Sequence, residues 1–161
     1  MRKLVLLTVA FALCGGCQSA GQAVADAQPQ AREALVPVTI VSRSARHVYQ
    51  SELAITPAQQ ARGLMYRTEL APDHAMLFPF RPARRTAFWM KNTLIPLDII
   101  FIRDNGTIAR IAEQATPLSL EPIDSGESVG AVLEIVGGGA AAAGLSVEDR
   151  VSWPGGPKPV P

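Results

Sequence analysis

Chemically useful side chains interrupt an otherwise apolar stretch at positions 88–102, which reads FWMKNTLIPLDIIFI. Lys91, Asn92 and Asp98 stand there among aromatic and aliphatic residues. Ionised side chains are rarely buried without a partner, so these residues need either solvent or another polar group. A few polar groups that converge on an apolar hollow form the usual site for a small ligand. The candidate ligand-binding residues are therefore Arg62, Met65, Lys91, Asn92 and Asp98.

The two cations of this set, Lys91 and Arg62, suit an anionic group, and a small anionic ligand is the partner that we predict. An enzyme is one alternative, with Asp98 as a general acid/base and Lys91 as its electrostatic partner. A protein–protein adaptor, the other alternative, would expose a large apolar patch. In a purely structural interpretation, Asp98 pairs with a nearby cation or caps the backbone at 92–94, and Asn92 shapes a bend. The residues alone leave these alternatives open, and we assign no catalytic residue.

Two short glycine motifs match enzyme signatures but lack the surroundings that those signatures need. Residues 126–130 fit G-x-S-x-G, yet Ser128 opens a predicted strand and no histidine follows it, which argues against a hydrolase. Residues 137–142 fit G-x-G-x-x-A, but too little chain remains for a dinucleotide-binding unit. Neither motif therefore predicts an activity.

Metal ligands cannot be assigned from residue spacing. His47 and His74 lack the spacing of a local zinc ligand set. Met65, Met76 and Met90 offer thioethers that suit Cu(I), but methionines beside aromatic and leucine residues more often fill gaps in a core. We predict neither a metal nor a cofactor.

The first 17 residues have the pattern of a bacterial signal peptide. Arg2 and Lys3 precede an apolar run at 4–13, which is shorter than the roughly 20 residues that span a bilayer. Two glycines and Cys17 follow, as in a lipoprotein signal whose cysteine is acylated, although Cys14 stands where leucine is usual. Secretion of a soluble form after cleavage at Ala25 is the alternative. We expect export to the cell envelope and a periplasmic location, with a lipid anchor on Cys17.

The remaining chain divides by composition into a linker, one domain and a tail. Residues 18–34 are rich in Gln, Ala and Gly, which predicts a flexible linker. Residues 35–153 form the domain, and the Pro/Gly segment 154–161 is a loose tail. Both cysteines precede the domain, so it contains no thiol for a disulfide. A formal charge of +1 gives no net attraction for a nucleic acid.

Short β-type runs separated by turn signals fill the domain. We expect a hairpin from 36–42 and 47–55, and a second hairpin across Asp104-Asn105-Gly106. Thr56 begins a short helix, because Pro57 follows it and Gln59 stands three residues on. A second short helix is predicted at 138–145. Further predicted strands are 75–80, 86–90, 97–103, 107–114, 128–136 and 150–153. The expected fold is mainly β (α+β), a compact antiparallel barrel-like or sandwich domain with two short helices.

Several of these segments together resemble the family named domain of unknown function 192. The resemblance rests on GLMYR (63–67), MLFPF (76–80), FWMKNT followed by IPLDI, the Asp-Asn-Gly turn and VLE (132–134), and it covers about residues 38–151. It implies a small exported or lipid-anchored protein with a compact, mainly β domain, and it implies no activity. Ala75 and Glu148 depart from the family pattern, which has glycine at both places.

Overall fold

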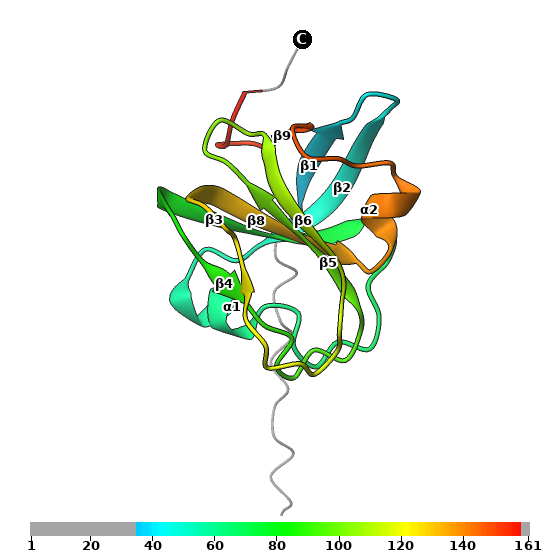
Figure 1. Ribbon diagram of the computed structural model, residues 1–161, viewed down its shortest axis with the longest axis vertical. Helices are drawn as coiled ribbons and strands as arrows, with labels where there is room; N and C mark the ends of the chain where they lie inside the picture. The colour runs from blue at the N-terminus through cyan, green and yellow to red at the C-terminus, as the bar shows by residue number, and fades with distance from the viewer. Residues whose placement is uncertain (1–34, 159–161) are drawn as a thin grey trace, which may run out of the picture. The chain divides into compact units, whose positions relative to one another are not determined.

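The computed structural model describes residues 35–158, and these form a mainly β domain (Figure 1). Nine strands and two short helices follow one another in the order β1 (Val36–Val41), β2 (Arg46–Leu53), α1 (Pro57–Arg62), β3 (His74–Arg84), β4 (Ala87–Phe88), β5 (Leu97–Ile102), β6 (Ile108–Ala115), β7 (Ile123–Asp124), β8 (Val129–Val136), α2 (Gly139–Ala142) and β9 (Arg150–Ser152). The predicted mainly β class with two short helices is therefore confirmed.

Seven strands form one mixed sheet in the order β6-β5-β8-β3-β2-β1-β9, and β4 pairs separately with β7. The prediction of a barrel-like sheet is wrong, because the sheet is open. One isolated bridge between Thr107 and Arg150 brings the two outer strands together at one point, without closing the ladder. The antiparallel expectation also fails at β2 and β3, which run parallel because α1 and the loop after it carry the chain back across the sheet.

Local sequence signals placed most of these elements. β1 and β2 form the expected antiparallel hairpin, and β5 and β6 form the second hairpin across Asp104–Gly106. Thr56 caps α1, because its side chain accepts a hydrogen bond from the backbone N–H of Gln59 and the Gln59 side chain accepts one from Thr56. The expected strand at 86–90 shrinks to two residues, and its partner β7 was not predicted. A two-residue strand has too short a pattern to read.

The central strands bury both faces of the sheet under two separate cores. The α2-side core joins β1, β5 and β8 to Ala140 of α2 and includes Ile40, Ile100 and Leu133. On the other face lies the α1-side core, which joins Phe78 and Phe101 to Leu64, just beyond α1. All six residues of β5 are buried, as expected for a strand covered on both faces. Side chains alternate between the two cores, so a single position in register decides which core a residue enters.

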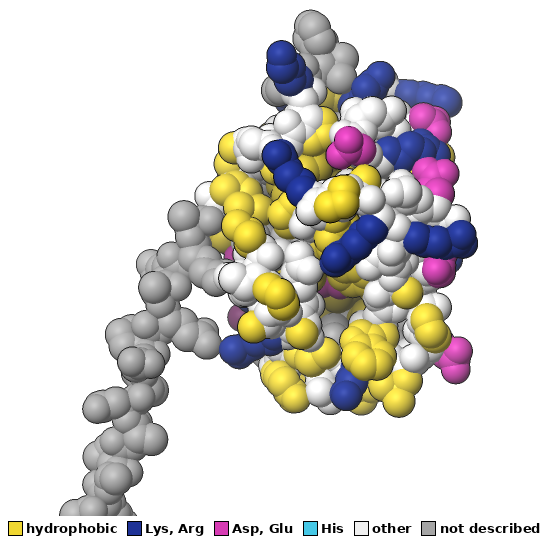
Figure 2. Space-filling model, turned by 90° about the vertical axis from the view of Figure 1, so that its left-hand side faces the viewer, with side chains coloured by type: hydrophobic (Ala, Val, Ile, Leu, Met, Phe, Trp, Pro, Cys, Tyr) yellow, Lys and Arg dark blue, Asp and Glu magenta, His cyan; other side chains and the backbone are white. Residues whose placement is uncertain are grey.

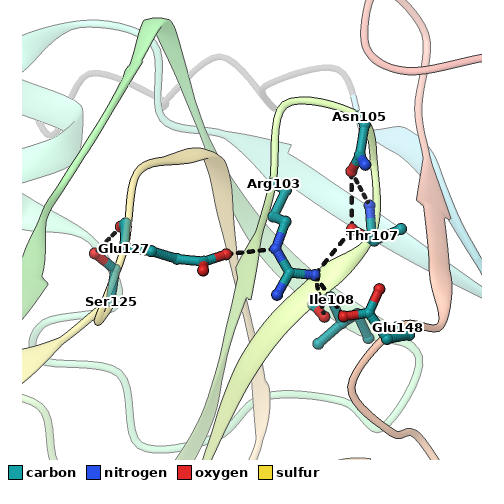
Figure 3. Close-up of polar contacts among 7 residues, drawn as sticks. All are labelled: Arg103, Asn105, Thr107, Ile108, Ser125, Glu127 and Glu148. Atoms are coloured by element: carbon teal, nitrogen blue, oxygen red, sulfur yellow. Dashed lines mark hydrogen bonds and ion pairs between the residues drawn. The ribbon is translucent and has the colours of Figure 1, made fainter.

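A cluster around Arg103 fastens three loops at the end of β5 (Figure 3). The guanidinium donates hydrogen bonds to Glu127 and to Glu148, the latter at 2.8 Å. It also donates to the Thr107 hydroxyl at 3.1 Å. The hydrogen bond to Glu127 is the largest of the influences that raise the pKa of Arg103. Because this cluster lies at the end of β5 opposite to the 88–96 segment, it supports the scaffold rather than the candidate site.

Several predictions concern residues outside the described range. The leader at 1–17, its Cys17 and the linker at 18–34 all fall there, as do the last three residues of the tail. Within residues 35–158, none of the helices is both long and apolar enough to cross a bilayer. The described start of the tail contacts the domain, since the Gly155 carbonyl accepts a hydrogen bond from Arg81.

Candidate functional site

A cavity of about 290 Å³ opens on the α1 side of the sheet. Its walls come from the end of α1 with the turn after it, from β3, and from the segment 86–89 that contains β4. Figure 2 shows this face, with a hollow bordered by hydrophobic side chains and by Lys or Arg. The lining residues that matter to the argument are Arg62, Gly63, Met65, Phe78, Phe80, Arg84, Phe88, Trp89 and Glu134.

The floor of the cavity is aromatic. Phe78 and Phe80 project from β3, and both side chains are buried. Phe88 packs edge-on against Phe78, with ring centroids 5.0 Å apart and an interplanar angle of 86°. The same ring lies 6.3 Å from Phe101 of β5. Edge-to-face packing holds these rings in fixed positions, so the floor offers a preformed apolar surface to a ligand.

The end of α1 brings the backbone close to this floor at Gly63. A Cβ atom on Gly63 would lie 3.5 Å from the Phe78 ring and 4.0 Å from Oε2 of Glu134. Gly63 has φ 46° and ψ −136°, a conformation that favours glycine. Its N–H donates to the Gln59 carbonyl at 2.8 Å, which ends the helix and directs the chain over the cavity. The capped start and the glycine end of α1 therefore position Arg62 and Met65.

Glu134 is a buried acid at the base of this cavity. It lies in the middle of β8, opposite Met76 on one side and Ile99 on the other. Only 5% of the residue is exposed, and among the residues of the described domain its carboxyl group has no hydrogen-bond or ion-pair partner. Desolvation by burial raises the pKa of Glu134 from 4.5 to about 8. At neutral pH the side chain is therefore mostly a neutral acid, able both to donate and to accept a hydrogen bond.

Two arginines stand where the cavity meets solvent. Arg62 is exposed and forms no ion pair with a described residue. The Arg84 guanidinium lies 4.4 Å from the centroid of the Phe80 ring, a cation–π contact that holds it at the edge. The site thus combines a basic rim with an aromatic floor and a neutral acid at depth.

The structure brings four of the five predicted residues close to this cavity. Arg62 and Met65 line it directly. The Asn92 side chain donates a hydrogen bond to the Tyr66 hydroxyl at 2.9 Å and contacts the Met65 sulfur at 3.9 Å, so it orients the neighbouring turn. The Lys91 ammonium lies 5.2 Å from the Trp89 ring, beside the cavity. Their role in ligand binding remains a prediction.

Asp98, the fifth predicted residue, lies elsewhere. It is 0% exposed and lines neither of the two cavities described for the domain. Its carboxylate accepts backbone N–H groups of Gln114 at 2.7 Å, Gly138 at 3.0 Å and Ala140 at 2.8 Å. Burial, and secondly the charge of Asp98, raise the pKa of nearby Tyr49. The purely structural interpretation named a nearby cation or the backbone at 92–94 as its partner, and those partners were wrong. An acid/base role would need a cavity beside Asp98, and neither of the two described cavities is lined by this residue.

Sequence reasoning missed Glu134, although a usable signal was present. The strand VGAVLEIV is apolar except for this glutamate, just as LDIIFI is apolar except for Asp98. A lone acid in a strand buried on both faces needs either a partner or a function. Applied to both strands, that rule would have found both residues. It could not have told which one faces a cavity.

Solved structures with the same fold are known. The chain is 44% identical to a protein of unknown function from Novosphingobium aromaticivorans DSM 12444, with a TM-score of 0.75, over 86% of this chain and 100% of that one. It is also 44% identical to a protein from Sinorhizobium meliloti 1021 that is provisionally described as a transcription regulator. That match has a TM-score of 0.73 and covers 75% of this chain and 95% of the other.

No curated protein matches the chain. A family model described as an uncharacterized ACR matches residues 38–153, nearly the whole described domain. This match confirms the resemblance carried by the GLMYR, FWMKNT and IPLDI segments. The chain therefore belongs to the domain of unknown function 192 (DUF192) family.

Proposed function

We propose that the domain is a binding module for a small amphipathic ligand that has an apolar or aromatic body and an anionic group. The observation that carries this proposal is Glu134, an acid that is buried, unpaired and directed at a cavity. Because no described residue bonds this carboxyl group and it lines the cavity, a ligand in the cavity can supply its hydrogen bond.

The two ends of the cavity select different groups of such a ligand. Glu134 as a neutral acid hydrogen-bonds an uncharged polar group at depth, such as a hydroxyl or a carbonyl. Arg62 and Arg84 at the rim pair with a carboxylate or another anion, where solvent still reaches. The rings of Phe78 and Phe88 contact the body between them.

The rim arginines provide the test of this proposal. Full-length protein is titrated calorimetrically with a series of aromatic and medium-chain carboxylates, and with amines of the same carbon skeleton. The carboxylates are expected to bind and the amines to bind at least about tenfold more weakly. The double change Arg62→Ala and Arg84→Ala is expected to lower carboxylate affinity by about 10- to 100-fold, the range for hydrogen bonds to charged groups.

Arg85→Ala is the matched control, because Arg85 adjoins Arg84 in sequence but pairs with Asp124 outside the cavity. It is expected to leave the affinity unchanged. Equal binding of amines and carboxylates, or equal effects of the two arginine changes, would contradict the proposal. So would a series in which no carboxylate binds.

We further infer that the protein is exported to the periplasm and carries a lipid anchor on Cys17. The support is the basic start, the short apolar run at 4–13 and the small residues before this cysteine. Cells fed labelled palmitate are expected to yield a labelled, membrane-bound protein, and Cys17→Ser is expected to remove the label. Cys14→Ser is the control that should retain it. Label retained on the Cys17→Ser variant would refute the anchor at this residue.

The description of the S. meliloti relative does not lead us to propose a nucleic-acid partner. This chain has 15 basic and 14 acidic residues, and a nearly neutral chain has no net attraction for a phosphate backbone.

A further inference from the structure

Exposed large hydrophobic side chains gather on three loops next to the cavity. Five of the nine that the described domain exposes lie in residues 64–67, 89–94 and 116–120. They are Tyr66, Trp89, Leu94, Leu118 and Leu120, with exposed fractions between 46% and 65%. We call these five side chains the loop patch. Figure 2 shows hydrophobic side chains around a basic one at the corresponding lower end of the molecule.

Backbone hydrogen bonds hold the three loops together as one surface. Tyr66 donates to Asn92 at 2.8 Å, Leu118 donates to Thr93 at 3.1 Å, and Met90 donates to Ser119 at 3.0 Å. The loop patch is therefore built by contacts between loops far apart in the sequence, and it does not consist of isolated exposed residues. Exposed apolar side chains that gather on adjoining loops indicate an interaction site.

The backbone of these loops is also strained. Tyr66, Asn92 and Leu118 have φ values of 64°, 55° and 63°, in the left-handed region. For a bulky residue this conformation costs about 1–2 kcal/mol. Strained residues persist where the surrounding structure fixes them, and they concentrate at functional sites. At Tyr66 and Leu118 the strain accompanies the exposure of an apolar side chain.

The charged residues of these loops are few, and a lysine adjoins the exposed tryptophan. Residues 64–67, 89–94 and 116–120 contain Arg67 and Lys91, and the exposed acids Glu69 and Glu121 follow on two of the same loops. Arg67 pairs with Glu52, whereas the Lys91 ammonium lies over the Trp89 ring. Trp and Tyr with a neighbouring lysine are the residues that settle at the level of lipid headgroups, while leucines enter the acyl region.

We infer that the loop patch docks the domain on a lipid bilayer. The N-terminal sequence supplies a second argument, which rests on the lipid anchor proposed above, since Cys17 is followed by 17 residues before Leu35. A chain of that length reaches at most about 60 Å, so an anchored domain stays within reach of the bilayer. Docking brings the cavity mouth to the membrane, because Met65, Trp89 and Thr93 of the same loops also line the cavity. The inference does not depend on the ligand proposed above.

The two tryptophans of the chain allow a direct test. In the full-length Trp153→Phe variant all tryptophan fluorescence comes from Trp89, and in Trp89→Phe it comes from Trp153. Each is mixed with vesicles of phosphatidylethanolamine and phosphatidylglycerol that carry brominated acyl chains. Trp89 is expected to shift its emission to shorter wavelengths and to be quenched, whereas Trp153 is expected to change little. The comparison separates docking of the domain from insertion of the N-terminal segment, which would leave both tryptophans unquenched.

A pair of charge substitutions tests the patch itself. Leu120 and Ile55 are 65% and 64% exposed, and only Leu120 belongs to the loop patch. Leu120→Glu is expected to lower the quenching of Trp89 at a given lipid concentration by at least about fivefold, and Ile55→Glu is expected to leave it unchanged. Circular dichroism checks that both variants are folded. Trp89 that stays unquenched on bound vesicles, or a patch that only associates with a second copy of the chain, would overturn the inference.

Discussion

Replacing Glu134 with glutamine is expected to remove most of the pH dependence of stability that the natural protein shows between about pH 5 and pH 8. Glu134 has its pKa raised to about 8 in the folded state, against 4.5 for an ordinary glutamate, because burial disfavours the charged form. In this pH range the unfolded chain releases the proton while the folded chain holds it. The free energy of unfolding therefore falls as the pH rises, by up to about 1.4 kcal/mol per pH unit.

The limits of this effect follow from the two pKa values. Below about pH 4.5 the acid is protonated in both states, and above about pH 8 it is ionised in both, so this residue adds no slope outside the range. The full difference is about 4–5 kcal/mol, a large part of the 5–15 kcal/mol that keeps a typical domain folded. Glutamine has a similar shape and does not ionise. The stability of the Glu134→Gln variant relative to the natural protein is therefore expected to rise as the pH rises through this range.

Urea denaturation from pH 4 to pH 9 measures the effect. Glu113→Gln is the matched control, because Glu113 is an exposed glutamate on β6 and is expected to leave the slope almost unchanged. If Glu134→Gln and the natural protein keep parallel profiles, Glu134 is ionised in the folded state. The neutral acid proposed at the cavity floor would then be wrong.

Replacing Asp98 with asparagine is expected to destabilise the domain by about 3 kcal/mol or more. The carboxylate accepts three backbone N–H groups, from Gln114, Gly138 and Ala140, so it joins β6 to the start of α2. Asparagine keeps the shape but has no charge and sets an NH2 group against at least one buried donor. Hydrogen bonds to a charged group contribute about 1.5–3 kcal/mol each, and a donor left without an acceptor adds its desolvation cost.

Chemical denaturation of Asp98→Asn beside Asp104→Asn tests this role. Asp104 is exposed in the β5–β6 turn, where a surface substitution changes stability by no more than about 0.5 kcal/mol. A small loss of stability at Asp98, close to that at Asp104, would contradict the structural role. It would also reopen the acid/base hypothesis, which the complete burial of Asp98 now opposes.

Predictions from sequence held where the cause was local. The α1 start depends on Thr56, Pro57 and Gln59 within one turn of chain. The β5–β6 hairpin depends on Asp104-Asn105-Gly106, where Gly106 has φ 86°. Family membership likewise followed from contiguous segments, and the family match confirms it. Within residues 88–102, Asp98 lies on the same face of β5 as Ile100 and Ile102, as the alternation of side chains along a strand requires.

Only the tertiary structure decided which polar residue faces a cavity. Asp98 and Glu134 are each a lone acid in an apolar strand, and β5 and β8 lie side by side. Pairing sets Ile99, not Asp98, beside Glu134, so the two acids project from opposite faces. On one face of the sheet, backbone N–H groups around α2 bond Asp98. On the other face, Gly63 and the open cavity lie beside Glu134. The open sheet and the parallel β2–β3 pair have the same origin. They depend on contacts between distant segments, and local spacing carries no information about such contacts.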